Sequence, residues 1–458
     1  MRLRLCVLSF RARTTTPSTV ALVRKAVILG ALGYALPAGA EQQPSQDTVR
    51  VTLSDARRLA VERNPDLLAS SLERPIAAGR LQQARTIRFN PSGDVLAPAG
   101  GNGMEFGLSQ ELEVFGQRRA RTASAKATLS RANALVLNTR RVIIGEVDRT
   151  FYRLVFQKQR TLLAESILDL NKRVSSIAER HLSAGEISRL DYNLAVIELG
   201  RSRSRALIAR RERDQIALDF ALLLGVGPRV VVDPALDPSQ HSPAIEADTL
   251  PSGDARALVE AGEKLKTDSL VAIALSRRAD LAAGAALIEE SRAELSLARR
   301  GAIPNVIARV VAEPNGASSG RVVRGGLGLT IPVFNRNRGE IASRRAALRQ
   351  AEIQRAGLEA RVKTEVNQAI AAYRAAAAEV EVLETTVLPP ARQNRRLLET
   401  AYREGKVGLP VLLLIRNQVI DAELDYWSAW LAEREALTTL AEITGQNLSG
   451  LPKTEAIR

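Results

Sequence analysis

The sequence predicts a mainly α-helical protein with a small β part, built from two similar halves. Aromatic residues make up only 3% of the 458 residues, and Ala, Leu, Arg and Glu are abundant, which is typical of long helices packed on small side chains. Three blocks of the first half recur, in the same order, in the second half. Short segments of alternating polarity precede the two longest helical stretches, and they are the expected strands.

Residues 1–40 are expected to be a cleaved secretory signal. Arg24 and Lys25 end a basic region, an apolar stretch follows, and Ala38, Gly39 and Ala40 offer small residues for cleavage. The apolar stretch is shorter than the roughly 20 residues of a spanning helix, which disfavours the alternative of an N-terminal membrane anchor. The only cysteine, Cys6, lies in this segment, so we expect a mature chain without a thiol.

The net charge of +15 by itself suggests a polyanionic partner. Much of that charge lies in the expected signal, however, because no acidic residue precedes Glu41. The six basic residues there are Arg2, Arg4, Arg11, Arg13, Arg24 and Lys25. Removing these six from +15 leaves +9, spread among Glu and Asp along the helices, so we expect no nucleic-acid partner.

The internal repeat sets the expected domain organisation. In its clearest block, Gly107-Leu108 and the 24 residues that follow align without a gap on Gly326-Leu327 and the residues after them. Between the halves, residues 228–251 carry five prolines, and either a free linker or a segment packed outside the helices is compatible with them. The expected parts are the signal 1–40, a first repeat 41–225, a connector 226–267, a second repeat 268–447 and a tail 448–458.

Each half is expected to contain a helix, a strand pair, a long helix, a glycine turn and a second long helix. Residues 117–184 contain no proline and repeat apolar residues at helical spacing, so an unbroken helix there would be about 100 Å long. The corresponding stretch of the second half, residues 339–387, is also free of proline. Helices of this length need neighbours along their whole extent.

The expected strands have one apolar and one polar face. Residues 104–114, 306–312 and 323–331 alternate in this way, and a short first strand is expected near 94–97. Strands of 9 to 11 residues with charges inward suit a membrane barrel with a wet lumen; two small hairpins on a soluble core are the alternative. A barrel needs at least eight strands, so several subunits would share it. The candidate lumen residues are Glu111, Glu113, Arg309, Glu313 and Arg324.

Two segments carry a resemblance to a known family. Residues 107–121, GLSQELEVFGQRRAR, and 327–342, LGLTIPVFNRNRGEIA, resemble the strand-to-helix junctions of TolC-like outer-membrane efflux proteins, with the heavy-metal CzcC-like branch the most similar. The similarity extends over residues 51–448. It implies a TolC-like α/β-barrel, in which four strands per protomer of a homotrimer form a 12-stranded transmembrane barrel and long antiparallel helices form a tunnel across the periplasm. It also implies three other contacts: outer-membrane lipid, a periplasmic adaptor (membrane fusion protein) and an inner-membrane RND pump.

The same resemblance implies a gate at the periplasmic tip. In the family, a tip turn carries a glycine and an aspartate six residues later, a pattern matched by Gly185 and Asp191. Tyr402, three residues before Gly405, matches a tyrosine of the second turn. Asp191 and Tyr402 are therefore the candidate latch between neighbouring coils. The alternative is that Asp191 only caps a helix and Tyr402 only packs.

The second turn departs from the family pattern. Val411 stands where the aspartate is expected, and Leu414 occupies a position that carries a constricting acidic ring in some members. A selectivity ring at the tip is therefore not predicted. Arg189 and Lys406 flank the two turns and are candidates for lining a basic mouth or contacting the adaptor.

No enzyme motif is present, and we expect neither a catalytic residue nor a cofactor or metal site. The predicted function is that of a passive outer-membrane channel subunit of a tripartite, RND-type efflux system in a Gram-negative cell, exporting heavy-metal cations or small toxic compounds. The alternative is a periplasmic adaptor-like protein with helical hairpins, which would need β-rich domains after the hairpin and no repeated strand pairs.

Overall fold

A computed structural model describes residues 48–96, 104–227, 231–234, 267–314, 320–404 and 406–445. All of them belong to the second of two compact units, which extends from Gln46 to Arg458. The expected signal and the C-terminal tail lie outside the described residues.

The first half begins with three short helices, which lead into a strand pair and two long helices. Thr52 caps the first helix by accepting a hydrogen bond from the Asp55 N–H, and Asn64 ends that helix and caps the next. The elements are β1 (Thr48–Val51), α1 (Leu53–Arg63), α2 (Pro65–Ser71), α3 (Glu73–Arg85), β2 (Ser92–Leu96), β3 (Glu105–Leu112), α4 (Gln117–Ser183) and α5 (Arg189–Leu223).

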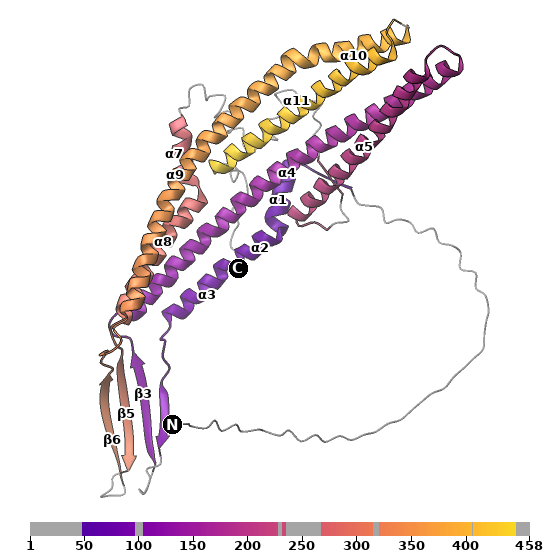
Figure 1. Ribbon diagram of the computed structural model, residues 1–458. Helices are drawn as coiled ribbons and strands as arrows, with labels where there is room; N and C mark the ends of the chain where they lie inside the picture. The colour runs from indigo at the N-terminus through magenta and orange to yellow at the C-terminus, as the bar shows by residue number, and fades with distance from the viewer. Residues whose placement is uncertain are drawn as a thin grey trace, which may run out of the picture. The chain divides into compact units, whose positions relative to one another are not determined.

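The second half follows the same plan after a short strand, β4, but two helices instead of three precede its strand pair. Its elements are β4 (Val231–Pro234), α7 (Thr267–Arg277), α8 (Ala279–Gly301), β5 (Val306–Pro314), β6 (Arg321–Leu329), α9 (Arg338–Val382), the π-helix η3 (Leu383–Val387), α10 (Leu388–Arg403) and α11 (Leu409–Ile443). Within this unit the strands β2, β3, β5 and β6 lie at one end of the long helices and the turns α4–α5 and α10–α11 at the other (Figure 1). The predicted class, mainly α with a small β part, is confirmed.

The helix α4 extends unbroken over 67 residues, as its proline-free sequence predicts. It packs against α3 and α8 on the side of the strands and against α5 and α11 toward the turns. Small buried residues, among them Ala120, Ala132 and Ala134, allow these neighbours to approach closely.

The second long helix differs from its expected form. Instead of ending near Val387, the chain passes from α9 through the π-helical turn η3 and continues helically as α10. Pro389 and Pro390 follow this turn, and a proline ring clashes with the carbonyl four residues earlier in an α-helix. The wider turn relieves that clash, because the Leu388 N–H bonds to the Leu383 carbonyl, five residues back.

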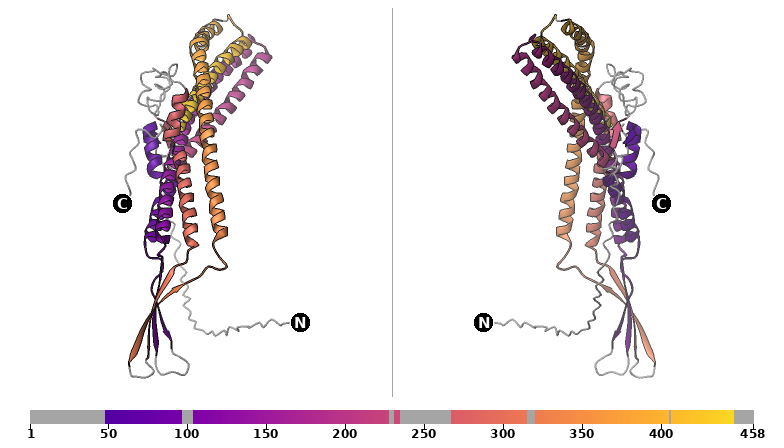
Figure 2. Two further views of the ribbon diagram at one scale, coloured as in Figure 1. Left: turned by 90° about the vertical axis from the view of Figure 1, so that its left-hand side faces the viewer. Right: turned by 90° about the vertical axis from the view of Figure 1, so that its right-hand side faces the viewer.

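The four longer strands form one antiparallel sheet in the order β2-β3-β5-β6, so the strand pairs of the two halves lie side by side (Figure 2). The predicted short first strand is β2, with five residues. A separate parallel pair joins β1 to β4, where Thr48 lies opposite Val231. The part of the connector formed by β4 is thus paired, and residues 228–230 and 235–266 lie outside the described residues.

The core consists of separate clusters along the helices. The largest joins α1, α4, α5 and α11 around aromatic rings, with Phe151 and Phe220 at a centroid distance of 6.2 Å and Tyr152 and Trp430 at 6.0 Å. A second cluster joins α7, α8, α9 and α11. A third, near the turns, includes Val174, Leu398 and Leu412 and holds the tips of the two hairpins together.

Candidate functional site

The turn between α4 and α5 is closed by backbone hydrogen bonds. Gly185 has φ 76°, a left-handed conformation that favours glycine, and the Glu186 N–H bonds to the His181 carbonyl at 2.8 Å. The His181 ring and the Glu186 carboxylate pair across the turn. Arg189 begins α5 as an exposed side chain, its guanidinium 5.9 Å from the centre of the Tyr192 ring.

Asp191 and Ser188 form a capping box at the start of α5. The Asp191 N–H donates to Ser188 Oγ at 3.1 Å, and Asp191 Oδ2 accepts from the Ser188 hydroxyl at 2.7 Å and from the Ser188 N–H at 3.4 Å. Within one chain, Asp191 is therefore a helix cap.

The second turn is described only in part. Gly405 and the Tyr402 side chain lie outside the described residues, although the Tyr402 backbone belongs to α10. The Lys406 N–H bonds to the Ala401 carbonyl at 2.9 Å, and its ammonium pairs with Glu404 at 2.5 Å. Val411 and Leu414, which stand at the family's acidic positions, are both exposed.

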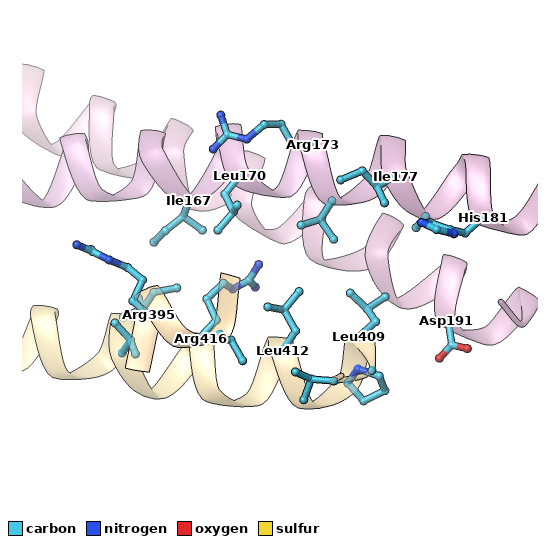
Figure 3. A pocket seen from close by; sticks show the side chains of 18 of the residues that line it. Ile167, Leu170, Arg173, Ile177, His181, Asp191, Arg395, Leu409, Leu412 and Arg416 are labelled. Carbon is cyan, nitrogen blue, oxygen red and sulfur yellow. The ribbon is translucent and has the colours of Figure 1, made fainter. Parts of the chain in front are cut away.

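A cavity of about 1000 Å³ lies between the two hairpins close to their turns. Its walls are mainly apolar, and Figure 3 shows Ile167 and Leu170 of α4 facing Leu409 and Leu412 of α11. Asp191 lines the end near the first turn. His181, Arg173, Arg395 and Arg416 supply its other labelled charged or polar groups.

Arg416 joins three helices at this cavity. Its Nη1 donates to Asn171 Oδ1 of α4, and its Nη2 lies 3.6 Å from Glu198 Oε2 of α5. The residue is only 7% exposed, and its Nε has no hydrogen-bond partner among the described residues. Burial lowers the pKa of the guanidinium and the Glu198 carboxylate opposes that shift, so Arg416 stays charged while losing part of its hydration.

The sheet has two chemically different faces. One face is apolar and exposed in the single chain, as predicted from the alternation. It includes Val95, Phe106, Leu108, Leu112, Val310, Val323, Leu327 and Leu329. The opposite face is polar and holds two ion pairs between strands, Arg309 with Asp94 at 2.8 Å and Arg324 with Glu313 at 2.7 Å.

Four of the five candidate lumen residues lie on this polar face. Arg309, Glu313 and Arg324 form the ion pairs, and Glu111 accepts a hydrogen bond from Asn305 Nδ2 at 2.7 Å. Glu113 lies beyond the end of β3, where its carboxylate pairs with Arg121 of α4 and ties the sheet to the helix.

Two important groups are absent from the sequence-based candidates. Arg416 gives no local signal, because a lone arginine in a helix is normally exposed. Asp94 lies in the short strand β2, whose five residues show little alternation, and its partner Arg309 is 215 residues away.

The described part of the chain carries neither a cluster of metal ligands nor an apolar helix long enough to span a membrane. No group of three or more His, Cys, Asp or Glu side chains there is arranged to hold a metal ion. Among those same residues, no helix combines the length and apolar character needed to cross a membrane.

Comparison with known proteins gives consistent results. Residues 270–446 match the family model of the outer membrane efflux protein. Over 409 residues the chain is 25% identical to the cobalt-zinc-cadmium resistance protein CzcC of Cupriavidus metallidurans, which covers 88% of this chain and 92% of the relative.

Solved structures with the same fold include an outer-membrane channel and a second protein that forms a transmembrane channel. The channel OprN superposes with a TM-score of 0.68 at 20% identity, covering 86% of this chain and 89% of OprN. CusC, whose structures concern transmembrane channel formation, gives a TM-score of 0.67 at 16% identity, with 87% and 93% covered.

Proposed function

We propose that the chain is one subunit of a passive export channel, with its sheet in the outer membrane and its long helices in the periplasm, because residues 270–446 match the outer membrane efflux protein family and the fold is that of solved channel structures. The family consists of conduits and not of enzymes. Energy for transport would then come from a partner protein, and this chain would provide the path.

The observation that carries this proposal is the exposed apolar face of the sheet. Leu327 of β6 is 81% exposed, and the other large apolar side chains named for that face are between 37% and 67% exposed in the single chain. A soluble protein rarely leaves so continuous an apolar surface uncovered. Lipid would cover it if the polar face, with its ion pairs, were turned toward a water-filled lumen.

Among the residues that the structure describes, the two edge strands of the sheet, β2 and β6, have no further strand partner. An open edge cannot remain in lipid, because its backbone N–H and C=O groups would lack hydrogen bonds. Three copies joined edge to edge would give twelve strands and close the barrel. We therefore include a homotrimer in the proposal.

The proposed partners are a periplasmic adaptor and an inner-membrane RND pump. The relative CzcC carries cobalt, zinc and cadmium resistance in its name, and this supports heavy-metal cations as the cargo. No three metal-binding side chains gather among the residues that the structure describes, so the channel would pass such ions without holding them. Arg189 and Lys406, exposed at the two turns, are proposed contacts of the adaptor or the basic lining of the channel mouth.

Membrane fractionation and single-channel recording test the channel directly. The protein should sediment with the outer membrane, migrate as a trimer until heated, and conduct ions in planar bilayers. A soluble monomer that gives no current would overturn the proposal and favour the periplasmic adaptor.

The proposed latch at Asp191 and Tyr402 has its own test. Asp191→Ala and Tyr402→Phe should each raise a small wild-type conductance, because a bond between neighbouring coils is lost. Ser188→Ala is the matched control, since it removes half of the capping box and keeps the carboxylate. If Ser188→Ala raises the conductance as much as Asp191→Ala does, Asp191 acts as a helix cap and not as a latch.

A further inference from the structure

The Asp94 and Arg309 side chains meet above Gly107 of β3, the strand that lies between theirs. Asp94 of β2 lies opposite Gly107 of β3, and Arg309 reaches it from β5 on the other side of that strand. A Cβ on Gly107 would lie 2.2 Å from Asp94 Oδ2 and 3.5 Å from Arg309 Nη2. The carboxylate therefore occupies the space that any other residue at 107 would fill.

The internal repeat gives this arrangement a second, incomplete copy. Gly326 is the repeat equivalent of Gly107, and the residue opposite Gly326 in the sheet is Arg309. Asp94 and Arg309 thus occupy equivalent places in the two halves and carry opposite charges. Around Gly326, however, no atom lies within 4 Å of an added Cβ, so this position is open in the single chain.

We propose that three copies of the chain close a ring of six alternating charges, three Asp94 and three Arg309, around the lumen at the level of Gly107 and Gly326. The ring rests on the trimeric barrel of the proposed function. In the trimer, strand β2 of the next copy would lie beside β6. The Asp94 of that copy would then approach Arg309 over Gly326. Within one chain, Asp94 and Arg309 meet over Gly107 in the same way.

The chemistry of arginine suits this place. A guanidinium carries five N–H donors, so Arg309 can face a carboxylate on either side. Each Asp94 would lie two strands, or about 10 Å, from Arg309, and the 2.8 Å ion pair across β3 shows that the two side chains span this distance. Opposite charges recur at a second pair of equivalent positions, Glu105 and Arg324, which lie on the same polar face. In a homotrimer, each such pair becomes an alternating ring.

Two neighbouring glycines provide the sharpest test. Both Gly325 and Gly326 have open space around an added Cβ, but Gly325 lies on the apolar face and Gly326 on the polar one. Gly326→Ala should shorten the lifetime of the unheated trimer in detergent about tenfold, and Gly325→Ala should not change it. In a single chain neither substitution meets an obstacle, so a loss confined to Gly326→Ala must come from a neighbouring copy.

Charge variants test the ring independently. Asp94→Asn and Arg309→Gln should each shorten the trimer lifetime, whereas the double exchange Asp94→Arg with Arg309→Asp should restore most of it, because alternation is preserved. Circular dichroism of each variant verifies that the helices are folded. Equal lifetimes for the two glycine variants, or a double exchange no better than the single variants, would overturn the ring while the channel stands. A wild-type chain that forms no trimer would overturn both.

Discussion

Arg416 is the residue whose substitution should most destabilise the packing of the two hairpins near their turns. Its guanidinium is held between α4, α5 and α11, and removing it leaves the Oδ1 atom of the buried Asn171 without its hydrogen-bond donor. Arg416→Gln should lower the free energy of unfolding by about 1–3 kcal/mol, because a buried polar group that loses its hydrogen bond cannot form one with water instead. Amide hydrogen exchange at the start of α11 should accelerate by roughly 10- to 100-fold.

Arg201 offers a matched control, because it pairs with the same carboxylate. Its guanidinium lies 3.0 Å from Glu198 Oε1, but its side chain is 65% exposed. A surface ion pair of this kind contributes about 0–1 kcal/mol, so Arg201→Gln should leave the exchange rates nearly unchanged. Equal rates in the two variants would mean that Arg416 does not hold the hairpins together.

Asp280 should give the protein an acid-sensitive contact at the start of α8. Burial acts to raise the pKa of this carboxyl, but hydrogen bonds from Arg278 at 2.6 and 3.0 Å outweigh it, so the pKa lies below its ordinary value. The unfolded chain then binds the proton first as the pH falls. The stabilisation is complete well above about pH 4 and is lost as the pH falls through the folded-state pKa.

Thermal melting of Asp280→Asn against wild type measures this contribution. The difference in melting temperature should be largest at neutral pH and should shrink below about pH 4. Asp66→Asn is the control. Asp66 is the second residue of α2 as Asp280 is of α8, and each is followed by a leucine at the corresponding place in its half of the chain. Asp66 is exposed and forms no ion pair that the structure describes. A difference for Asp280→Asn that stays constant down to pH 3 would contradict the assignment.

The sequence alone was sufficient to predict that Asp191 lies at the first turn, because its spacing from Gly185 matches the family pattern. The residues that surround Asp191 in the cavity could not be predicted in this way. A glycine followed by a polar residue at a helix start is a local signal, and the capping box is a local structure. Arg416 is different, because its burial depends on three helices from distant parts of the chain. Nothing in the residues next to Arg416 indicates that convergence.

At the scale of the elements, the glycines that follow α5 and α11 occupy corresponding places in the two halves. The same glycine-to-alanine substitution should nevertheless destabilise the protein to different degrees at these two helix ends. Gly225 and Gly445 both adopt left-handed backbone, with φ 67° and 72°. A Cβ on Gly225 would lie 2.3 Å from the Arg63 carbonyl oxygen, whereas on Gly445 the nearest atom is the Arg277 Cβ at 3.3 Å. Gly445→Ala should cost about 1–2 kcal/mol from the backbone alone. Gly225→Ala should lower the free energy of unfolding by roughly 1–3 kcal/mol more than this, because the backbone at Arg63 must move to make room for the new methyl group.

Thermal unfolding followed by circular dichroism compares the two variants. Gly185→Ala supplies the reference for backbone strain, because Gly185 has φ 76° and open space around its Cβ. Gly445→Ala should resemble Gly185→Ala, with Gly225→Ala clearly less stable. Equal losses at Gly225 and Gly185 would show that α1 moves away from α5 without cost.

The long helices were predictable because a proline-free, periodic sequence determines them locally. The continuation through Pro389 and Pro390 was not, since it depends on the π-turn that widens the helix before them. The pairing of β1 with β4 was not predictable either. It joins two four-residue strands far apart in the chain, and strands this short carry no period of their own.

At the scale of the whole molecule, the two faces of the sheet define how the chain would meet the membrane. Val310 and Val311 are consecutive residues in β5 with opposite orientations, Val310 on the apolar face and Val311 on the polar face opposite Arg324. They therefore allow one substitution to be placed on either side of the proposed barrel wall. The side chain, the strand and the depth along the sheet remain nearly the same.

Val310→Lys should block assembly into the outer membrane, and Val311→Lys should permit it. A lysine facing lipid near the bilayer midplane costs about 2–4 kcal/mol per copy, and three copies multiply that cost. On the wet face the penalty is only repulsion from Arg324, about 0.2–1 kcal/mol. The measurement is the fraction of each variant recovered as trimer in outer membranes. If Val311→Lys is excluded and Val310→Lys is accepted, the sheet is turned the other way and its apolar face lines the interior.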